Sequence, residues 1–266
     1  MSEEIVSLAQ ISIQSLGQVG FRFDMAGAVI YIDPYLSNSV QEKESADLAR
    51  LRPVPIRPET ITDADWVLIT HAHRDHCDRD TLLPLAAASP RCRFYCPSAA
   101  ARVLQQEGIA AERIAIARSG QPLQVGNGLA VFPVPSAHPS VERDERGEFV
   151  SVGYVLQYGE AKIYHAGDTG LDDEVISMLQ PFAGFDVAFI PVNEQNYFRA
   201  RSGIIGNMSV REAFQFAEEI GALVVVPTHW DMFAANQVYK EEIELLYRKM
   251  RPNFKLIMDP DGMLKF

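Results

Sequence analysis

The chain has 266 residues, 47% of them hydrophobic, and a formal net charge of −11. A chain of this length and composition can bury one large core, and we expect residues 1–266 to form a single domain. It has no apolar run long enough for a transmembrane helix, and residues 1–4 lack the basic start of a signal peptide. We therefore expect a cytoplasmic protein without membrane contacts. The negative charge also argues against nucleic acid as a partner, because like charges repel.

The first part of the chain is predicted to begin with a three-stranded meander and then to alternate between strand and helix. Runs of β-branched and aromatic residues predict strands at residues 10–15, 19–24, 28–32 and 65–70. A helix is predicted from Asp78, where an acidic turn precedes a leucine-rich run, to Ala86. Pro84 is compatible with this helix only near its start. A second helix is predicted over residues 98–106.

The second part of the chain opens with another set of strands, and helices follow it. We predict strands at residues 129–134, 150–157, 161–165, 186–190 and 222–226. We predict helices near residues 172–180, 209–219 and 238–250. Two β-rich openings, each followed by helices, suggest an internal duplication, although the sequence shows no repeat. Two sheets packed face to face with helices outside would satisfy this order.

The three cysteines, Cys77, Cys92 and Cys96, are odd in number and have no disulfide spacing, which is typical of a reducing compartment. Cys92 and Cys96 lie across an expected strand, where thiols pack as small apolar groups. We interpret Cys77 as a space-filling residue as well, with a redox-sensitive thiol as the alternative.

The most informative segment is His71-Ala72-His73-Arg74-Asp75-His76, which places three of the six histidines in six positions. Imidazole and carboxylate groups are preferred ligands of borderline divalent metals, and four of them on one loop can serve two adjacent ions. The segment lies between the strand predicted at 65–70 and the helix predicted from Asp78, so both of its ends are anchored. A polar surface turn is the alternative, which so dense a cluster disfavours.

The other three histidines also follow predicted strands. His138 and His229 come directly after strands, as His71 does, and we interpret both as metal ligands. His165 closes a strand too, but three residues later Asp168 is flanked by glycines and is the better ligand candidate. We interpret His165 as a structural residue.

In order and spacing, seven candidate ligands resemble those of the metallo-β-lactamase superfamily of metal-dependent hydrolases: His71, His73, Asp75, His76, His138, Asp168 and His229. The segment Tyr31-Ile32-Asp33-Pro34-Tyr35 also matches, and the resemblance covers roughly residues 10 to 260. It implies an α/β (α+β) fold, a four-layer αββα sandwich with the metals at one edge. By this resemblance Asp33 supports the metal loop, and Asp231, close to the last ligand, is expected to be a second supporting residue.

The resemblance implies two divalent metal ions per chain, zinc or manganese, with iron as a further candidate. The ligands of the first ion would be His71, His73 and His138. Those of the second ion would be Asp75, His76 and His229. Asp168 would bridge the ions, with a water or hydroxide between them. Such a pair activates water near neutral pH and stabilises a developing oxyanion. Asp75 and Asp168 are therefore expected to be catalytic residues as well as ligands.

Within the superfamily, the chain is most similar to the branch of the L-ascorbate-6-phosphate lactonases. The segments that carry this resemblance are residues 164–168, 194–196 and 222–233. β-Lactamases usually carry a cysteine where Asp168 stands, and flavodiiron oxygen reductases carry a glutamate where His73 stands. We therefore expect a lactonase that acts on a small anionic, sugar-phosphate-like lactone. A phosphodiesterase and a non-catalytic metal-binding regulatory protein remain the alternatives, and the oligomeric state stays open, a homo-oligomer included.

Three long segments, residues 34–60, 135–149 and 191–208, are expected to be irregular. The last one follows a predicted strand, so it should open on the metal face. Its side chains are candidates for substrate binding: Asn196, Tyr197, Arg199 and Arg201. An arginine there could hold a phosphate or carboxylate through two hydrogen bonds. The alternative is a solvated loop in which Ser209 caps the next helix.

Overall fold

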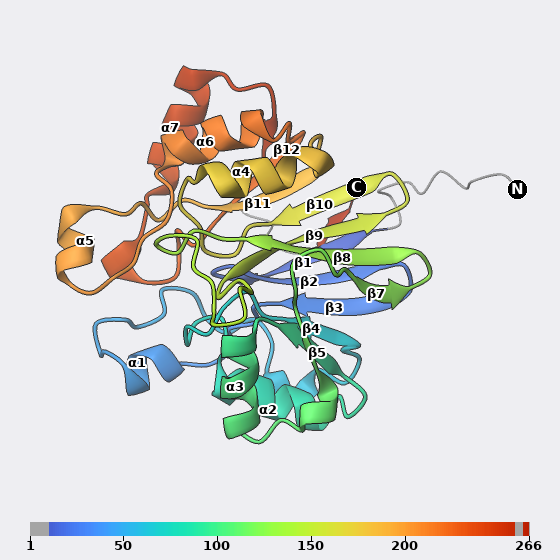
Figure 1. Cartoon of the computed structure of the whole chain (residues 1–266). Coiled ribbons are helices and arrows are strands. Elements are labelled where there is room, and N and C mark those ends of the chain that lie inside the picture. Colours follow the sequence, from blue (N-terminus) through green and yellow to red (C-terminus); the bar gives the residue numbers. More distant parts are fainter. Residues whose placement is uncertain (1–10, 259–262, 266) are drawn as a thin grey trace, which may run out of the picture.

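Two β-sheets packed face to face form the centre of the molecule, and helices cover both outer faces (Figure 1). The computed structural model describes residues 11–258 and 263–265. Residues 1–4 and residue 10, the predicted start of the first strand, therefore lie outside the described part. The αββα architecture that the sequence predicts is confirmed.

The first sheet has seven strands among the described residues, in the order β14-β1-β2-β3-β4-β5-β6. Their bounds are β1 Ser12–Gly17, β2 Gly20–Met25, β3 Ala28–Ile32, β4 Trp66–Leu68, β5 Arg93–Cys96, β6 Ile114–Ile116 and β14 Met263–Lys265. β1, β2 and β3 pair antiparallel, as the predicted meander requires, and β3 to β6 pair parallel. The carboxyl ends of β3 and β4 therefore lie at the same edge.

The second sheet has seven strands in the described part of the chain, in the order β13-β12-β11-β10-β9-β8-β7. Their bounds are β7 Leu123–Gly126, β8 Leu129–Pro135, β9 Val152–Tyr158, β10 Ala161–His165, β11 Val187–Pro191, β12 Val224–Thr228 and β13 Lys255–Leu256. β10, β11 and β12 are parallel, and β9 is antiparallel to both β8 and β10. The strands β8, β10 and β12 therefore share one direction, and their carboxyl ends lie at one edge of the sheet.

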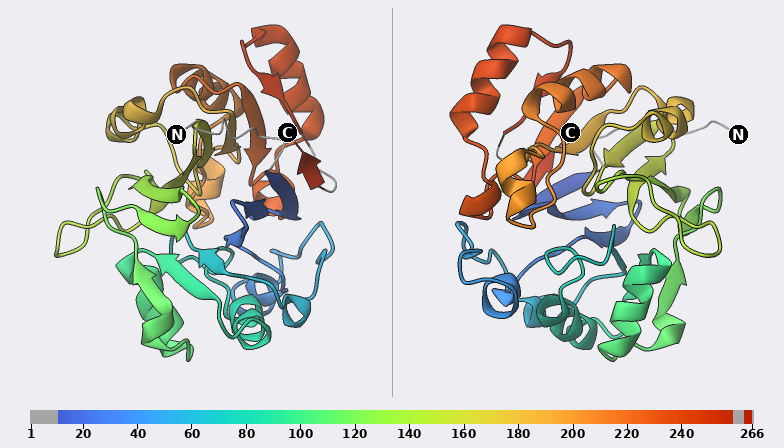
Figure 2. Two further views of the ribbon diagram at one scale, coloured as in Figure 1. Left: turned by 90° about the vertical axis from the view of Figure 1, so that its right-hand side faces the viewer. Right: turned by 60° about the vertical axis from the view of Figure 1, so that its left-hand side comes forward.

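Helices α2 Arg79–Ala88 and α3 Ser98–Gln106 cover the outer face of the first sheet (Figures 1 and 2). The second sheet is covered by α4 Asp173–Leu179, α6 Val210–Glu219 and α7 Lys240–Met250. Two short helices, α1 Ser39–Lys43 and α5 Tyr197–Arg201, lie at the same end of the molecule, at the left in Figure 1. Among the described residues, no helix is long and apolar enough to cross a membrane.

Alternating side chains let each sheet pack on both faces. On β3, Ile30 and Ile32 pack between the sheets, whereas Tyr31 packs on the side that α2 covers. Phe23 and Phe189, from opposite sheets, meet with ring centroids 5.7 Å apart. Close packing of this kind leaves the strand ends little freedom, so the edges can hold side chains in fixed positions.

The structure differs from the prediction in two helical regions, and it also contains strands that were not predicted: β6, β7, β13 and β14. Pro84 is the sixth residue of α2 and lies inside it, although a position near the start was predicted. It has no N–H to donate within the helix, but the burial of Leu82 and Leu85 against the first sheet offsets the lost bond. The segments 34–60 and 191–208, predicted to be irregular, contain α1 and α5. Helices of five residues are too short to show a periodic pattern.

Candidate metal centre

The loop between β4 and α2 carries four of the candidate ligands and is fixed at both ends. At its start, Thr70 donates its backbone N–H to Asp33 Oδ1 over 2.8 Å and its hydroxyl to Asp33 Oδ2 over 2.6 Å. At its end, the Asp78 side chain caps α2 and accepts a 2.7 Å hydrogen bond from the Ser39 hydroxyl. Both anchoring carboxylates are buried, so the loop cannot drift relative to the sheet.

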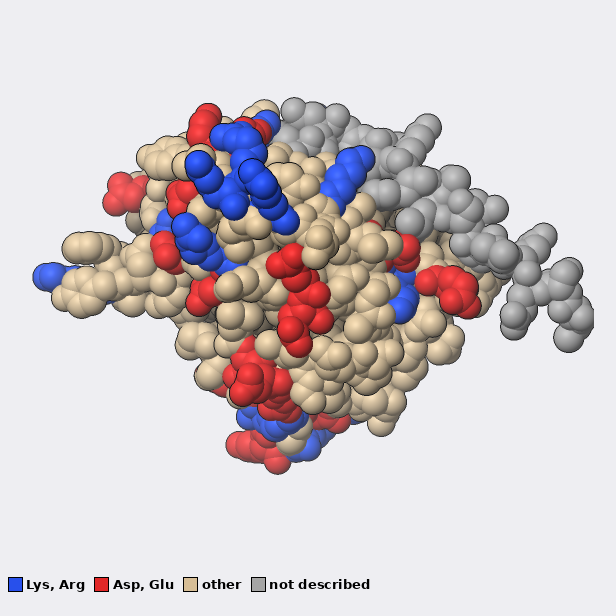
Figure 3. Space-filling view, turned by 90° about the horizontal axis from the view of Figure 1, so that it is seen from above, with Lys and Arg blue, Asp and Glu red and all other residues tan. Residues whose placement is uncertain are grey.

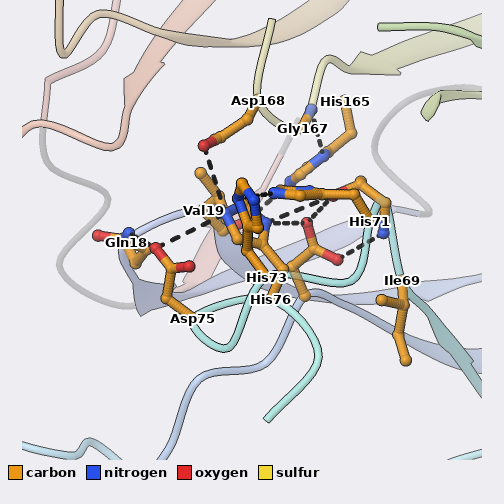
Figure 4. Close-up of polar contacts among 12 residues, drawn as sticks. Gln18, Val19, Ile69, His71, His73, Asp75, His76, His165, Gly167 and Asp168 are labelled. Atoms are coloured by element: carbon orange, nitrogen blue, oxygen red, sulfur yellow. Dashed lines mark hydrogen bonds and ion pairs between the residues drawn. The ribbon is translucent and has the colours of Figure 1, made fainter. Parts of the chain in front are cut away.

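The remaining candidate ligands come from the second sheet. His138, Asp168 and His229 follow β8, β10 and β12, whose carboxyl ends share one edge. This edge faces the β4–α2 loop, and Figure 4 shows Asp168 pointing toward the loop histidines. Ligand atoms within 4.8 Å of one another form three overlapping groups: His71, His73 and His138; His71, His76 and Asp168; Asp75, His76 and His229. The structure thus brings all seven candidates together.

Asp168 lies between the two predicted sets of ligands. Its Oδ2 is 3.6 Å from His138 Nε2, a ligand of the predicted first ion. The same oxygen is 3.5 Å from His76 Nε2 and 3.2 Å from His229 Nε2, two ligands of the predicted second ion. One carboxylate oxygen therefore faces both sets, which is the position that a bridging ligand requires.

Several polar atoms of the site are buried without a hydrogen-bond partner in the described part of the chain: His76 Nε2, His138 Nδ1, His229 Nδ1 and Asp168 Oδ1. Such orphaned atoms are rare in folded proteins and often mark an ion site. His76 Nδ1 lies 2.7 Å from Asp33 Oδ2, which favours the proton on Nδ1 and leaves the Nε2 lone pair available. The residues therefore fit divalent metal ions, and the His/Asp clusters suit a binuclear site.

Burial and neighbouring charges divide the histidines into two kinds. Burial lowers the pKa of His71 well below its ordinary value and that of His138 to about 4, so both are neutral. Burial also acts on His76 and His229, but nearby carboxylates, with Asp168 first, outweigh it. The pKa of His76 is raised well above its ordinary value, and that of His229 rises to about 9. Metal binding would replace protons on these two rings by the cation.

Sequence reasoning missed Gln18, a buried residue of the β1–β2 turn. Its Nε2 donates to Asp75 Oδ2 over 2.7 Å and lies 3.0 Å from His229 Nε2. Its backbone carbonyl accepts the N–H of His229 over 3.1 Å. The turn therefore positions two ligands of the predicted second ion, Asp75 and His229 (Figure 4 shows the contact with Asp75). The signal in the sequence was faint, a single polar residue between two glycine-containing strand ends.

Several other residues named from the sequence lie near the site without belonging to the ligand groups. His165 Nε2 lies 2.8 Å from the carbonyl of Val19, and its ring stacks on Phe189, so it has a structural role. Asp231, close to the last ligand, has its carboxylate 2.6 Å from Arg52 Nε. All three cysteines are free and buried, and burial raises the pKa of Cys77 to about 12, which keeps it a thiol.

A pocket of about 450 Å³ opens on the ligands, and five of them line it: His73, Asp75, His138, Asp168 and His229. Arg74 and Arg79 also line it, paired with Glu44 and Glu107. From the segment 191–208, the residues in its wall are Gly203, Ile204 and Ile205. The segment thus does reach the metal face, through its apolar end.

The predicted substrate-binding residues come earlier in the same segment. Asn196 caps α5 by accepting the backbone N–H of Arg199 over 3.0 Å. The guanidinium of Arg199 donates to the carbonyls of Glu194 and Gln237, over 2.6 and 2.9 Å. Tyr197 and Arg201 are exposed. Substrate contact by these four residues stays a prediction.

The fold and the buried His/Asp site define the class: the protein is a metal-dependent hydrolase with the metallo-β-lactamase fold. The family described as "Beta-lactamase superfamily domain" matches residues 29–230, and the chain belongs to this family.

Similar proteins cover nearly the whole chain. A UPF0173 metal-dependent hydrolase of Caldivirga maquilingensis is 28% identical over 253 residues, which span 94% of this chain and 95% of that protein. Among solved structures, the isothiocyanate hydrolase from Delia radicum gut bacteria has a TM-score of 0.74 at 18% identity and covers 96% of this chain and 99% of its own. Igni18, a metallo hydrolase from Ignicoccus hospitalis, has a TM-score of 0.69 at 22% identity, covering 96% of this chain and 99% of its own. At these identities the two structures share the fold.

Proposed function

We propose that this metal-dependent hydrolase holds two divalent metal ions, zinc, manganese or iron, and opens small anionic lactones. The observation that carries the proposal is the position of Asp168. Its Oδ2 lies 3.2 to 3.6 Å from histidines of both ligand sets, and it lines an open pocket. Two ions sharing this carboxylate would be accessible to a small molecule from solvent.

The ions and the chain would have distinct tasks in the reaction. Two divalent ions held here would supply a nucleophilic water at neutral pH and positive charge for a developing oxyanion. The chain keeps the ligands oriented: Asp33 favours the proton on Nδ1 of His76, and Gln18 fixes Oδ2 of Asp75. We propose that the catalytic role of Asp75 and Asp168 is to hold the ions at the pocket.

Two arginines that line the pocket favour an anionic substrate over a neutral one. Arg74 and Arg79 line it, and 33% and 52% of their side chains are exposed. Exposed ion pairs such as those with Glu44 and Glu107 are weak, so an anionic group of the substrate could exchange with either carboxylate. Arg201, exposed on α5, is a further candidate for such a contact.

The resemblance of three segments to L-ascorbate-6-phosphate lactonases favours a lactone over a phosphodiester. Residues 164–168 include Asp168, and residues 222–233 include His229. Residues 194–196 lie at the base of the segment whose other end lines the pocket, where Glu194 forms a β-bridge with Asn207. The resemblance is therefore concentrated in segments that deliver the ligands or support the pocket.

Turnover of a small substrate panel tests the proposal. Protein loaded with zinc or with manganese would be assayed with anionic lactones, neutral lactones and bis-p-nitrophenyl phosphate, with Asp168→Ala as the control for contaminating enzymes. Lactone hydrolysis that the variant loses supports the proposal. Hydrolysis of the phosphodiester alone would support a phosphodiesterase. Metal binding without any turnover would support a regulatory metal-binding protein.

We further propose a cytoplasmic location and a small anionic molecule as the partner. The three cysteines are free and buried, as in proteins of reducing compartments. The charge of −11 disfavours a polyanionic partner, whereas two bound cations would attract a small anion to the pocket.

A further inference from the structure

A second pocket, of about 390 Å³, adjoins the one that opens on the ligands. It lies between α5 and the segment that follows α1, two parts of the chain that come together at the same end of the molecule (Figure 2). Leu48 and Ile204 line both pockets. Because the two pockets share these side chains, one ligand that passes over Leu48 and Ile204 can occupy both.

The second pocket has an apolar wall that is open to solvent. Phe198 lines it and is 75% exposed, a large value for a phenylalanine. Leu48 and Ile204 are half-buried, and Ala235 completes the wall. The other lining residues are polar: Ser45, Asp47, Arg199 and Ser202. A pocket that combines apolar side chains with a few polar groups is typical of a small-molecule site.

The segment 193–207, which we call the arm, holds this wall in a fixed place. Asn207 Nδ2 donates to Asn193 Oδ1 over 2.7 Å, and both side chains are buried at the base of the arm. The two carbonyls bound by Arg199 tie α5 to the arm's base and to the segment before α7. In Figure 3 the arm stands out at the left and is mostly uncharged. Its exposed aromatic ring is therefore presented by a supported segment.

Arg199 lines the second pocket, yet its guanidinium already serves these two carbonyls. An anion in this pocket would have to compete with them, whereas an apolar group gains contact with Phe198, Leu48 and Ile204. Burial of such surface is favourable by about 25 cal/mol per Å². The chemistry of the wall thus favours an apolar occupant.

We propose that this second pocket, the tail pocket, binds an apolar substituent of the substrate while the hydrolysable group lies at the metal ligands. The assignment of that group rests on the proposed function, whereas binding of the tail does not. The substrate class is thereby narrowed to lactones or esters that carry an alkyl or aromatic tail next to the reacting ring.

Binding of straight-chain carboxylates from butanoate to decanoate to the metal-loaded protein, measured by calorimetry, tests the tail pocket. The carboxylate would occupy the metal pocket and the chain would extend over Ile204. We expect the affinity to rise roughly two- to fourfold for each added methylene until the tail pocket is full, since a fully buried methylene corresponds to about fourfold. Phe198→Ser should flatten this dependence, and Ala235→Asp should abolish it by placing a charge in the wall.

Tyr239→Ser is the matched control. Tyr239 is an exposed aromatic residue directly before α7, 66% exposed, and it lines neither the metal pocket nor the tail pocket. The Tyr239 variant should keep the chain-length dependence. Equal flattening in both variants, or affinities of the wild-type protein that do not change with chain length, would overturn the tail pocket.

The same series separates this inference from the proposed function. If carboxylates bind with the expected chain-length dependence and no lactone is hydrolysed, the tail pocket stands and the lactonase proposal fails. If short lactones are hydrolysed but neither binding nor kcat/KM changes with chain length, the lactonase proposal stands and the tail pocket fails.

Discussion

The Asp33 carboxylate and the His76 imidazole form a pair in which neither side chain is exposed to solvent, with Oδ2 2.7 Å from Nδ1. Asp33 also accepts two hydrogen bonds from Thr70, so one carboxylate fixes both the start of the ligand loop and one ligand on it. Its backbone has a φ of +43°, in the left-handed region that L-residues rarely occupy. Such strain persists where surrounding bonds hold it, as they do here.

Asp33→Asn keeps the shape of this side chain and removes its charge. We expect the affinity for the metal ion at His76 to fall about 10- to 100-fold, because a carboxylate partner raises the basicity of a ligating histidine. Competition with a chromogenic chelator measures this. Asp33→Ala would also leave His76 and Thr70 without their buried partner and should lower the free energy of unfolding by about 1–3 kcal/mol, measured in urea. Unchanged metal affinity in the asparagine variant would contradict the role given to the charge.

Asp168→Ala and His76→Ala should abolish hydrolysis and leave the fold largely intact. Both side chains lie at the strand edge, outside the three large apolar clusters. Loss of either ligand removes donors that the second ion needs. Activity, metal content and circular dichroism of the two variants check this. Near wild-type turnover in either variant, once contaminating enzyme is excluded, would refute it.

Gln18→Met removes the amide that contacts Asp75 and His229 and keeps the length of the side chain. We expect the second equivalent of metal to bind about tenfold more weakly, with little change in the first, since losses of supporting contacts fall in that range. Stepwise titration of metal-free protein by calorimetry distinguishes the two equivalents. Gln124→Met, an exposed change on β7, is the control. If both equivalents weaken alike, Gln18 only supports the fold.

Arg74→Gln should impair anionic lactones more than neutral ones. Arg74 lines the metal pocket, and we expect a loss in kcat/KM worth about 1–2 kcal/mol for anionic substrates only. Arg201→Ala should have the same selective effect if α5 contacts the substrate. Arg199→Ala releases the two carbonyls at the base of the arm, so it should affect both substrate types. Equal losses for both types in Arg74→Gln would show that this arginine only shapes the pocket.

Some residues of the site could be predicted from the sequence alone, and others could not. The loop from His71 to His76 is a dense local cluster, and His138 and His229 directly follow apolar strands, so each could be selected without knowledge of the fold. Asp168 could be selected from its flanking glycines, whereas its bridging position was implied by the family resemblance. The structure then brought these residues to one edge because β8, β10 and β12 share a direction.

Gln18 could not be selected in this way. It meets His229 across 211 positions of sequence, and only the packing of the two sheets creates that contact. For Arg199, too, the sequence could not predict the contacts that the structure shows. Its charge and position predict contact with an anion, which stays a prediction, whereas in the structure its guanidinium donates to two backbone carbonyls. A helix this short leaves no periodic trace in the sequence.

The ligands are divided between the two sheets, four on the loop after β4 and three at the ends of β8, β10 and β12. Bound cations would therefore act as cross-links between the two halves of the chain, which the exposed turn at Gly120 separates. A cross-link stabilises one edge of a sandwich more than the other. Amide exchange should accordingly slow on metal binding at the ligand edge, in the loop after β4 and in the residues that follow β8 and β12, while the opposite edge, around the β7–β8 turn, keeps its rate.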